Sequence, residues 1–485
     1  MRWGRAIRKK LHPSAGDWHL FQPSSGPPLE PTESQLYSSE EQDTFSLQSS
    51  SAKVQNKAVR KEKKEGDAVP LILWWDPISG YSGDDVIRCQ QLTCHVTTDR
   101  EKWLQNDVTM LSFYGPSLSC HELPLPRREG DLWSLYHDES PKNRDFLFSH
   151  QSVMELFNYT ATFQRTSDFP FPTQWLDAES DITSSEYVVP VSEKTRLRTT
   201  DKLAPVLYVQ SDCGAPSDRD HFVSMLQRYV TVDSYGACLN NRQFPNYTRL
   251  SFDGKGDMSP MTSEEFYRFA ARYKFAIAIE NAACPDYVTE KLWRPLQLGV
   301  VPIVFGAPNI KDFLPTNHSA LVVEDFESME VLAAAIHHYD KDDQLYASLM
   351  PHKHNGLISN PTLKQLLHRR PQNGNVRTAI LEDYDCFLCQ KLHKAIEQHK
   401  SGKSISKSVG NNTHNGCEKP GEFGDSGKYI RGESSANFYH VPWRFGEAAA
   451  CVMRKLIEQN RHVPQETFDA MVARTADNFE RECSS

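Results

Sequence analysis

From Ala204 onward, short apolar segments alternate with longer segments of helical spacing, and this alternation constrains the fold more than any other feature. The apolar segments read PVLYVQS, TVDSYG, KFAIAIE, VVPIVFG and ALVVEDF, and the helical segments include DRDHFVSMLQRYV, EEFYRFAARY, VTEKLWRPLQLG and MEVLAAAIHHYD. Such alternation is typical of a parallel sheet covered by helices on both faces. These sheets bind ligands at the carboxyl ends of their strands. The sequence therefore predicts an α/β fold with a ligand site at that edge.

A chain of 485 residues is too long for one ordinary core, so we expect two domains and appended segments. Residues 13–68 contain too few large apolar groups to offset the entropy of ordering. VPLILWW, MLSFYG and DLWSLYH, which begin at residues 69, 110 and 131, predict buried strands of a first domain. The predicted regions are a disordered, basic and polar N-terminal stem at 1–68, a first domain at 69–200, a Rossmann-like domain at 201–375, and a cysteine-containing C-terminal extension with a terminal helix at 376–485.

Charge and missing motifs argue against several function classes. The net charge is −9, whereas nucleic-acid-binding proteins usually carry a basic face, so we expect no nucleic-acid partner. No G-x-G-x-x-G stands at the first strand-to-helix turn of the second domain, and no G-x-x-x-x-G-K-[ST] occurs anywhere. Dehydrogenase and nucleotide-hydrolase functions are therefore disfavoured.

Cysteines and sequons together favour the secretory pathway. The chain has 11 cysteines, more than most cytosolic enzymes carry. Sequons begin at Asn158, Asn246, Asn317 and Asn411, and we predict these four asparagines as glycosylation sites. Residues 1–12 are basic, like the flank of a signal anchor, but no run of about 18 apolar residues follows. Three explanations stay open: a membrane anchor is absent from this sequence or isoform, the protein enters the pathway in another way, or it is cytosolic.

The stretch FAIAIENAACPDYVTEKLWR at 275–294 is the strongest candidate for a ligand site. A strand ends at Glu280 and Asn281, and a charged helix begins shortly afterwards. Free N–H groups and the helix dipole favour an anion there, and Lys291 adds a positive charge. Glu290 would repel a phosphate but could accept hydrogen bonds from sugar hydroxyls, so the combination suggests a nucleotide sugar. Spacing alone favours a simpler interpretation, in which Glu290 and Lys291 are ordinary helix-start residues and Asn281 is a turn residue.

A series of motifs resembles the α-1,3-fucosyltransferases, which form glycosyltransferase family ten. The donor segment reads EN at 280–281, YVTEKLWRP at 287–295 and LGVVPIVFG at 298–306. Further matches are HDESPKN at 137–143, FNYTATFQRTSDFP at 157–170 and YVQSDCGAPSDRD at 208–220. LWW at 73–75 and CFLC at 386–389 resemble the branch of fucosyltransferases 10 and 11, which is protein O-fucosyltransferase-like. The matches keep one order over roughly residues 70–390, too long a series for an accident.

The resemblance implies a two-domain glycosyltransferase fold of the B type, in which residues 69–200 face the acceptor and 201–375 bind GDP-fucose. It implies inverting transfer of L-fucose, with GDP-fucose as donor substrate. We expect this transfer to need no metal and no cofactor, because cationic side chains can replace a metal at the diphosphate. The fucosyltransferase 10 and 11 branch is associated with the endoplasmic reticulum and with Ser or Thr of folded, disulfide-bearing protein modules. The better-known branch forms α-1,3 linkages to N-acetylglucosamine of glycans. We therefore expect one of these two acceptor classes and a location in the endoplasmic reticulum or Golgi lumen, where family members are type II membrane proteins.

The resemblance assigns the catalytic base to Glu139, in the Glu-Ser-Pro segment of the first domain. Inversion by a single displacement needs one base to take the proton of the acceptor hydroxyl and a group that holds the leaving diphosphate. Asp138 is the nearest rival, and Glu139 could instead be a solvated loop acid.

The resemblance also assigns donor contacts in the second domain. Arg219 and Lys291 would hold the diphosphate, although Arg219 could also be a plain helix-start residue. Asn281, Tyr287 and Glu290 would contact ribose, phosphate or fucose, and Tyr287 fits a packing role equally well. Glu280 could be a buried acid paired internally.

No metal site is predicted. Asp218 and Asp220 have D-x-D spacing but match the family's arginine segment. Cys386 and Cys389 could form a structural disulfide, half a zinc site with His393 or Cys417 nearby, or a redox pair. We favour the disulfide, and Cys89 with Cys94 makes a second candidate pair.

Two other functions are compatible with the sequence. A catalytically inactive relative could act as a binding or quality-control protein of the secretory pathway. A transferase for another nucleotide sugar would be equally compatible with the predicted sheet. Intact Glu139, Asn281, Glu290 and Lys291 favour an active fucosyltransferase.

Overall fold

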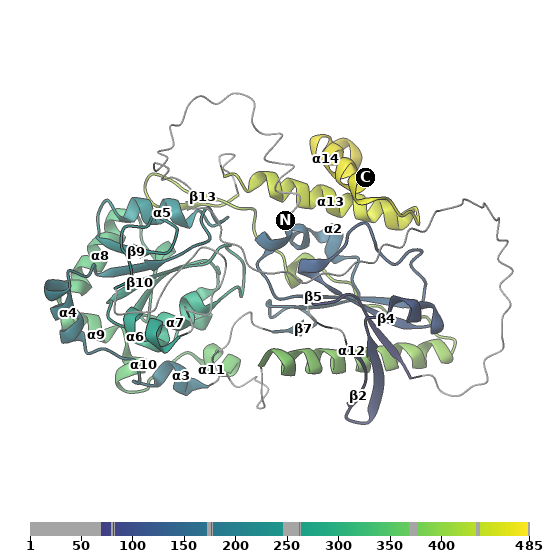
Figure 1. The fold of residues 1–485 in the computed structure, drawn as a ribbon, viewed down its shortest axis with the longest axis horizontal. Helices are drawn as coiled ribbons and strands as arrows, with labels where there is room; N and C mark the ends of the chain where they lie inside the picture. The colour runs from purple at the N-terminus through teal and green to yellow at the C-terminus, as the bar shows by residue number, and fades with distance from the viewer. Residues whose placement is uncertain are drawn as a thin grey trace, which may run out of the picture. The chain divides into compact units, whose positions relative to one another are not determined.

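The computed structural model contains two large sheets, each packed against helices, and one additional antiparallel pair of short strands (Figure 1). The described residues are 69–78, 81, 83–171, 176, 178–245, 261, 263–367, 376–432 and 437–483, with the side chains of 376–379 left out. The predicted stem and the sequon at Asn246 lie outside these residues. Both sheets consist mainly of parallel strands, which confirms the predicted α/β class.

The first sheet has seven strands in the order β2-β3-β1-β4-β5-β6-β7. Their bounds are β1 Leu71–Asp76, β2 Asp84–Cys89, β3 Leu92–Thr97, β4 Thr109–Tyr114, β5 Asp131–His137, β6 Tyr159–Thr162 and β7 Phe169–Pro170. All neighbouring strands are parallel except β2 and β3, which form an antiparallel hairpin. The connections carry short helices: η1 Arg100–Gln105, η2 Gly115–Ser117, η3 Pro141–Arg144, η4 Leu147–Ser149 and α2 Gln151–Met154.

The second sheet has five strands, all parallel, in the order β12-β11-β10-β8-β9. Their bounds are β8 Val206–Val209, β9 Val232–Tyr235, β10 Phe275–Ile279, β11 Val301–Phe305 and β12 Leu321–Val322. These strands are the five apolar segments from which the parallel sheet was predicted, and that prediction is confirmed.

Helices cover both faces of the second sheet. α5 (Arg219–Leu226) and α8 (Met329–Lys341) pack against one face, while α6 (Glu264–Ala270) and α7 (Glu290–Leu298) pack against the other. Consecutive strand residues point to opposite faces, so Val206 belongs to the first of these cores and Leu207 to the second. The remaining helices of this region are α3 Glu179–Thr183, α4 Val191–Thr200, α9 Asp343–Ser348, α10 Pro351–His354, α11 Pro361–Leu367, η6 Ile310–Phe313 and η7 Val323–Asp325.

The C-terminal residues pack against both faces of the first sheet. α12 (Val376–Lys400) runs along one face, where the hydroxyl of Tyr384 lies 3.2 Å from Ser112 Oγ and 2.5 Å from Ser134 Oγ. α13 (His440–Glu458) lies on the other side of the sheet, next to η4 and α2 (Figure 1). Residues 376–485, predicted as an extension, therefore supply part of the core of the first sheet. The last elements are η8 Asn412–His414, β13 Glu422–Phe423, β14 Tyr429–Ile430, α14 Gln465–Asp477 and α15 Phe479–Cys483.

The predicted disulfide between Cys386 and Cys389 is wrong. Cys386 pairs with Cys89, and Cys389 pairs with Cys94. Residues three apart on an α-helix have Cβ atoms about 5–6 Å apart, whereas a disulfide needs about 3.5–4.5 Å. Both cysteines lie within α12, which keeps them apart and directs them to hairpin β2–β3. The candidate pair of Cys89 with Cys94 is also wrong, because Cys94 lies opposite Ile87 in that hairpin.

The prediction that Asn158 is a glycosylation site is wrong for the folded protein. Its side chain is buried, and its Oδ1 accepts hydrogen bonds from the Trp133 N–H and from Arg127 Nη2, both at 2.9 Å. Its Nδ2 donates to the Ser408 carbonyl at 3.0 Å. A glycan on Nδ2 would have no space here, so this asparagine fixes the chain near β5 instead.

The other predicted glycosylation sites are not excluded by their surroundings. Asn317 is exposed, and Asn411 is half-buried, with its Nδ2 3.0 Å from His414 Nε2. Glycosylation of Asn317, Asn411 and Asn246 stays a prediction. Within the described part of the chain, every helix is too short or too polar to cross a bilayer.

The two disulfides of α12 lead to a prediction of non-additive stability. Each disulfide alone closes a long loop, with sequence separations of 297 and 295 residues. When one disulfide is intact, the second closes only the small ring formed by residues 89–94 and 386–389, about ten residues in total. Replacing both cysteines of one bridge by Ala should therefore cost about 2–3 kcal/mol of unfolding free energy. Replacing all four should exceed the sum of the two single losses by about 3 kcal/mol, because the long loop then opens. Urea unfolding followed by circular dichroism measures the three values, and additive losses would contradict the connectivity.

Candidate active site

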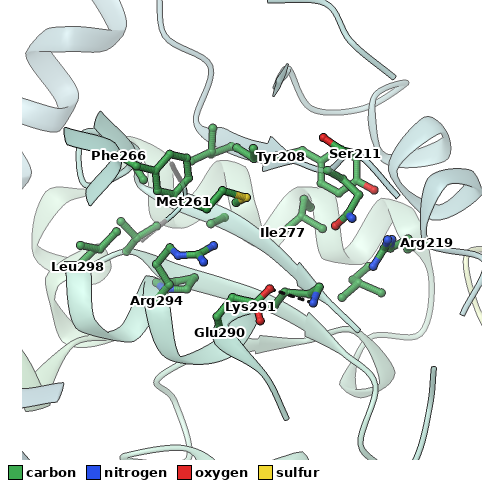
Figure 2. A pocket seen from close by; sticks show the side chains of 18 of the residues that line it. Tyr208, Ser211, Arg219, Met261, Phe266, Ile277, Glu290, Lys291, Arg294 and Leu298 are labelled. Carbon is green, nitrogen blue, oxygen red and sulfur yellow. Dashed lines mark hydrogen bonds and ion pairs between the residues drawn. The ribbon is translucent and has the colours of Figure 1, made fainter. Parts of the chain in front are cut away.

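A cavity of about 450 Å³ lies at the carboxyl edge of the second sheet (Figure 2). Its walls come from β8 and the loop after it, from β10, and from one face of α7. This is the edge at which the sequence predicts a ligand site. The cavity brings together four of the predicted donor-site residues: Arg219, Asn281, Glu290 and Lys291.

One face of α7 lines the cavity with charged residues near its start and apolar residues near its end. Glu290, Arg294 and Leu298 follow one another at intervals of four residues, so they lie on the same face of the helix. Thr289 caps the helix, and its Oγ1 lies 3.0 Å from Lys291 Nζ. The helix therefore points its first turn and Lys291 at one end of the cavity, whereas Arg294 lies nearer to Phe266 and Leu298 (Figure 2).

Glu280 holds the start of α7 in place. Its carboxylate is buried and accepts hydrogen bonds from the Thr289 N–H at 2.8 Å and from Thr289 Oγ1 at 2.9 Å. Burial raises the pKa of Glu280, although Lys291 opposes this effect. Glu280 is thus a buried acid paired internally, as one of the sequence interpretations proposed.

Lys291 and Glu290 form a charged pair at the start of α7. Lys291 Nζ lies 3.1 Å from Glu290 Oε1 and 3.4 Å from Glu280 Oε2. Burial alone would raise the pKa of Glu290, but Lys291 and Arg294 outweigh it and lower this pKa to about 2. Burial would lower the pKa of Lys291, but the two carboxylates raise it. Both side chains are therefore charged at neutral pH.

Arg219 is the most deeply buried cation of the site. Its side chain is 1% exposed, and its Nη2 donates to the Asp212 carbonyl oxygen. Its Nε and Nη1 have no hydrogen-bond partner among the described residues. A buried guanidinium group with unpaired donors is costly unless an anion satisfies it. Figure 2 shows Arg219, Lys291 and Arg294 around the cavity, where they can surround such an anion.

Two further polar atoms of the cavity wall are buried without partners in the described part of the chain. These atoms are Oδ1 of Asn281 and Nε of Arg294. The guanidinium group of Arg294 lies 5.3 Å from the centre of the Phe266 ring. A ligand with both donors and acceptors could satisfy these atoms, so the site is suited to a polar ligand with an anionic part.

Apolar side chains form the other part of the cavity and were missed by the sequence analysis. They are Leu207, Met261, Phe266, Ala270, Ala276, Leu298 and Val300. Helical spacing on α7 and α6 could have indicated Arg294, Leu298, Phe266 and Ala270. Nothing in the local sequence connects them with residues on β8, because the sheet alone brings the segments together. A cationic end and an apolar end suit a nucleoside diphosphate.

Glu139 lies in the turn that follows β5 in the first sheet. Its Oε2 accepts a hydrogen bond of 2.6 Å from Asn143 Nδ2. Next to it, Lys142 Nζ lies 2.6 Å from Asp212 Oδ2, on the loop whose carbonyl binds Arg219. The structure thus places the turn with Glu139 beside the wall of the cavity.

Tyr287 does not line the cavity and packs instead with Phe163, Ala282, Cys284 and Cys417. Its ring is buried, with its centre 5.1 Å from that of Phe163. Burial and the charges of Glu280, Glu290 and Glu139 raise the pKa of Tyr287 well above 10, while a hydrogen bond with Ser140 opposes this. The packing interpretation of Tyr287 describes this environment, and the contact with Phe163, which directly follows β6, shows that the two sheet regions meet here.

The loop between β10 and α7 is joined covalently and by ion pairs to residues outside the second sheet. Cys284 forms a disulfide with Cys417. Nε of Arg165, a residue that follows β6, lies 2.7 Å from Oδ1 of Asp286. These contacts restrain the segment between Asn281 and the first turn of α7.

Candidate metal ligands in the described residues are already engaged. The two clusters with suitable spacing are Cys94, Cys389 and His393, and Cys213, Asp220 and Cys238, and in each cluster the two sulfur atoms form a disulfide. Asp220 accepts hydrogen bonds from the Tyr208 hydroxyl at 2.7 Å and the Gly214 N–H at 2.6 Å. Asp218 accepts a hydrogen bond from the Phe423 N–H at 2.9 Å. Both carboxylates of the D-x-D segment are therefore already hydrogen-bonded to other groups of the protein.

Comparison with known proteins connects this geometry with one family. The model of the family described as "Fucosyltransferase, N-terminal" matches residues 67–174, and that of "Glycosyltransferase family 10 (fucosyltransferase) C-term" matches residues 199–408. A solved structure, "Crystal Structure of alpha1,3-Fucosyltransferase with GDP", is 17% identical and covers 66% of this chain and 93% of its own, with a TM-score of 0.36.

Curated relatives match over a longer part of the chain. "GDP-fucose protein O-fucosyltransferase 3" of Homo sapiens is 38% identical over 417 residues, which cover 85% of both chains. The protein of the same name from Bos taurus is 38% identical over 415 residues, or 85% of this chain and 84% of the relative. Identity at this level over most of both chains, together with the two family matches, shows that the chain belongs to glycosyltransferase family 10, the fucosyltransferases.

Proposed function

We propose that this fucosyltransferase transfers L-fucose from GDP-fucose, with inversion, to a Ser or Thr hydroxyl of a folded, disulfide-bearing protein module. The relatives named GDP-fucose protein O-fucosyltransferase 3 support a protein acceptor. The observation that carries the proposal is the buried Arg219 guanidinium group, which lines a cavity beside the turn of Glu139 and has two donor atoms without partners among the described residues.

The donor fits the two ends of the cavity. The diphosphate of GDP-fucose would bind Arg219 and Lys291, because cations both hold the diphosphate and stabilise its charge when it leaves. The guanine ring would lie against the apolar side chains near Phe266 and Leu298. Asn281 and Glu290 would bind hydroxyl groups of ribose or fucose. Since Glu290 is ionised and paired with Lys291, it can accept hydrogen bonds from sugar hydroxyls.

The reaction is one displacement at C1 of fucose. Glu139 takes the proton of the acceptor hydroxyl as the oxygen bonds to C1, and the bond between C1 and the phosphate oxygen breaks. The electron pair of that bond leaves with GDP, whose added charge Arg219 and Lys291 stabilise. No metal is assigned to a step, because the cationic side chains supply the stabilisation that a metal would give.

The disulfides support a location in the lumen of the secretory pathway, in the endoplasmic reticulum or Golgi. Ten cysteines of the described residues form five disulfides, and Cys120 is the free cysteine among them. Disulfides of this number persist in oxidising compartments and are rare in the cytosol.

The acceptor class is tested with a set of folded, disulfide-bonded modules, the same modules after reduction and alkylation, and N-acetyllactosamine. Release of GDP and fucose incorporation should occur with one or more folded modules and be lost after reduction.

Glu139→Gln should lower the rate at least about 100-fold, because the general base is lost. The exposed Glu101→Gln is the matched control and should retain the rate. Transfer to N-acetyllactosamine alone would contradict the protein acceptor, and full activity of Glu139→Gln would contradict the base.

Arg219→Lys tests the diphosphate site. Lysine keeps the charge but loses the forked donors of the guanidinium group, so GDP affinity should fall about tenfold to 100-fold. Isothermal calorimetry with GDP measures this change. Arg228→Lys, at an exposed position just after α5, should bind GDP as the parent does. Equal affinity for the Arg219 variant would remove Arg219 from the donor site.

Metal independence is tested by treating the enzyme with EDTA. GDP release should be unchanged, because the buried cations neutralise the leaving group. Loss of activity that manganese restores would show that a metal takes part.

A further inference from the structure

The turn after β5 contains a hydrogen-bond donor for its own carboxylate. Ser140 caps η3, and the N–H of Asn143 donates to the Ser140 carbonyl at 2.8 Å. This short turn brings Asn143 back over Glu139, where its Nδ2 lies 2.6 Å from Glu139 Oε2. The local sequence Glu-Ser-Pro-Lys-Asn therefore fixes both the carboxylate and the amide that holds it.

An amide suits this position because it does not titrate. Nδ2 of Asn143 donates a hydrogen bond at every pH, and it does not take up the proton that a base must receive. A donor to a carboxylate stabilises the ionised form and lowers the pKa of the acid. The same bond limits rotation of the Glu139 side chain, so less freedom is lost when the acceptor binds.

The turn itself is fixed at its C-terminal end. Arg144 donates through Nη2 to the Leu118 carbonyl and lies 3.5 Å from Cys120 Sγ. Asp145 and Phe146 then adopt left-handed conformations, with φ of 47° and 58°. Such conformations are costly for residues with a side chain and persist only where neighbouring structure holds them.

α13 provides that neighbouring structure. The Phe146 ring lies 5.5 Å from the ring of Trp443. At Gly446 the helix comes so close that an added Cβ would lie 2.2 Å from the Asp145 carbonyl oxygen. The turn is therefore enclosed between the end of β5 and a helix about 300 residues later in the chain.

The other side of the turn is fixed to the donor cavity. Lys142 Nζ pairs with Asp212 at 2.6 Å, and the Asp212 carbonyl accepts from Arg219 Nη2. Lys142 and Asn143 are adjacent, so one residue connects the turn with the diphosphate site while the next holds the carboxylate. This arrangement fixes the position of Glu139 relative to the bond that breaks.

We propose that Asn143 is a positioning residue for the catalytic base, which it holds by a hydrogen bond to Glu139 Oε2. The proposal rests on the proposed function, because it requires Glu139 to act as the base. Asn143 touches neither donor nor leaving group in this scheme, and it acts through Glu139.

The test compares Asn143→Ala and Asn143→Asp with the parent enzyme. Asn143 is exposed, so neither change disturbs the core. Asn143→Ala should lower kcat about tenfold while the affinity for GDP stays unchanged. Loss of the donor should also raise the pKa of Glu139, so the acid side of the kcat profile should move up by roughly 0.5–1 pH unit.

Asn143→Asp provides a signature that a structural role would not give. Two carboxylates at this distance share a proton, which raises their apparent pKa further. The variant should therefore be the least active near pH 6 and should recover as the pH rises. Release of GDP from GDP-fucose, with the folded module as acceptor and with water alone, gives the profiles.

Gln465→Ala is the matched control, because Gln465 makes the same amide-to-carboxylate bond to Asp469, four residues later, on α14. It should retain both kcat and the pH profile. If both Asn143 variants keep the pH profile of the parent while Glu139→Gln is inactive, the positioning role of Asn143 is overturned and the proposed function is not. An active Glu139→Gln would instead overturn the proposed function.

Discussion

The cavity at the carboxyl edge of the second sheet depends on one electrostatic constraint, a cluster of buried positive charge. Arg219 is 1% exposed and keeps two donor atoms without protein partners among the described residues. A buried cation of this kind is tolerated where carboxylates stand near it and where an anion completes its hydrogen bonds. Asp212 provides part of this compensation through its carbonyl oxygen and through its carboxylate, 3.7 Å from Arg219 Nη2, and a diphosphate would provide the rest. The disulfide Cys213–Cys238 restrains the loop after β8, which carries Asp212 in the wall of the cavity.

Several of these features could be predicted because they follow from local sequence. Short apolar strands between helices indicated the parallel sheet, and the start of α7 indicated Glu290 and Lys291. The apolar part of the cavity could not be predicted in this way. Met261 and Phe266 belong to the segment before β10, while Leu207 lies on β8, so only strand order brings them together. Tyr287 shows a related difficulty, because an aromatic residue beside charged ones can pack against a neighbouring element as readily as bind a ligand.

The cysteines show how far local spacing can mislead. Cys386 and Cys389 are three residues apart, and a regular helix prevents them from pairing. Their partners are about 300 residues earlier, on hairpin β2–β3. The same long range separates Tyr384 from Ser112 and Ser134, whose hydroxyl groups it contacts in the core of the first sheet. No local pattern indicates such contacts, since they depend on how α12 returns to the sheet.

The donor side and the base side of the site differ in which parts of the chain maintain them. The cavity lies within residues 199–408, which the family match covers, whereas α13 begins at residue 440 and lies outside both matched segments. Yet α13 encloses the strained residues Asp145 and Phe146, directly after the turn of Glu139. The proposed donor site therefore lies in the part of the chain that the family match covers, while the position of the proposed base Glu139 depends on a C-terminal helix. Because the proposed reaction brings the acceptor hydroxyl to Glu139, a change in this C-terminal region would alter acceptor geometry without altering the proposed diphosphate site.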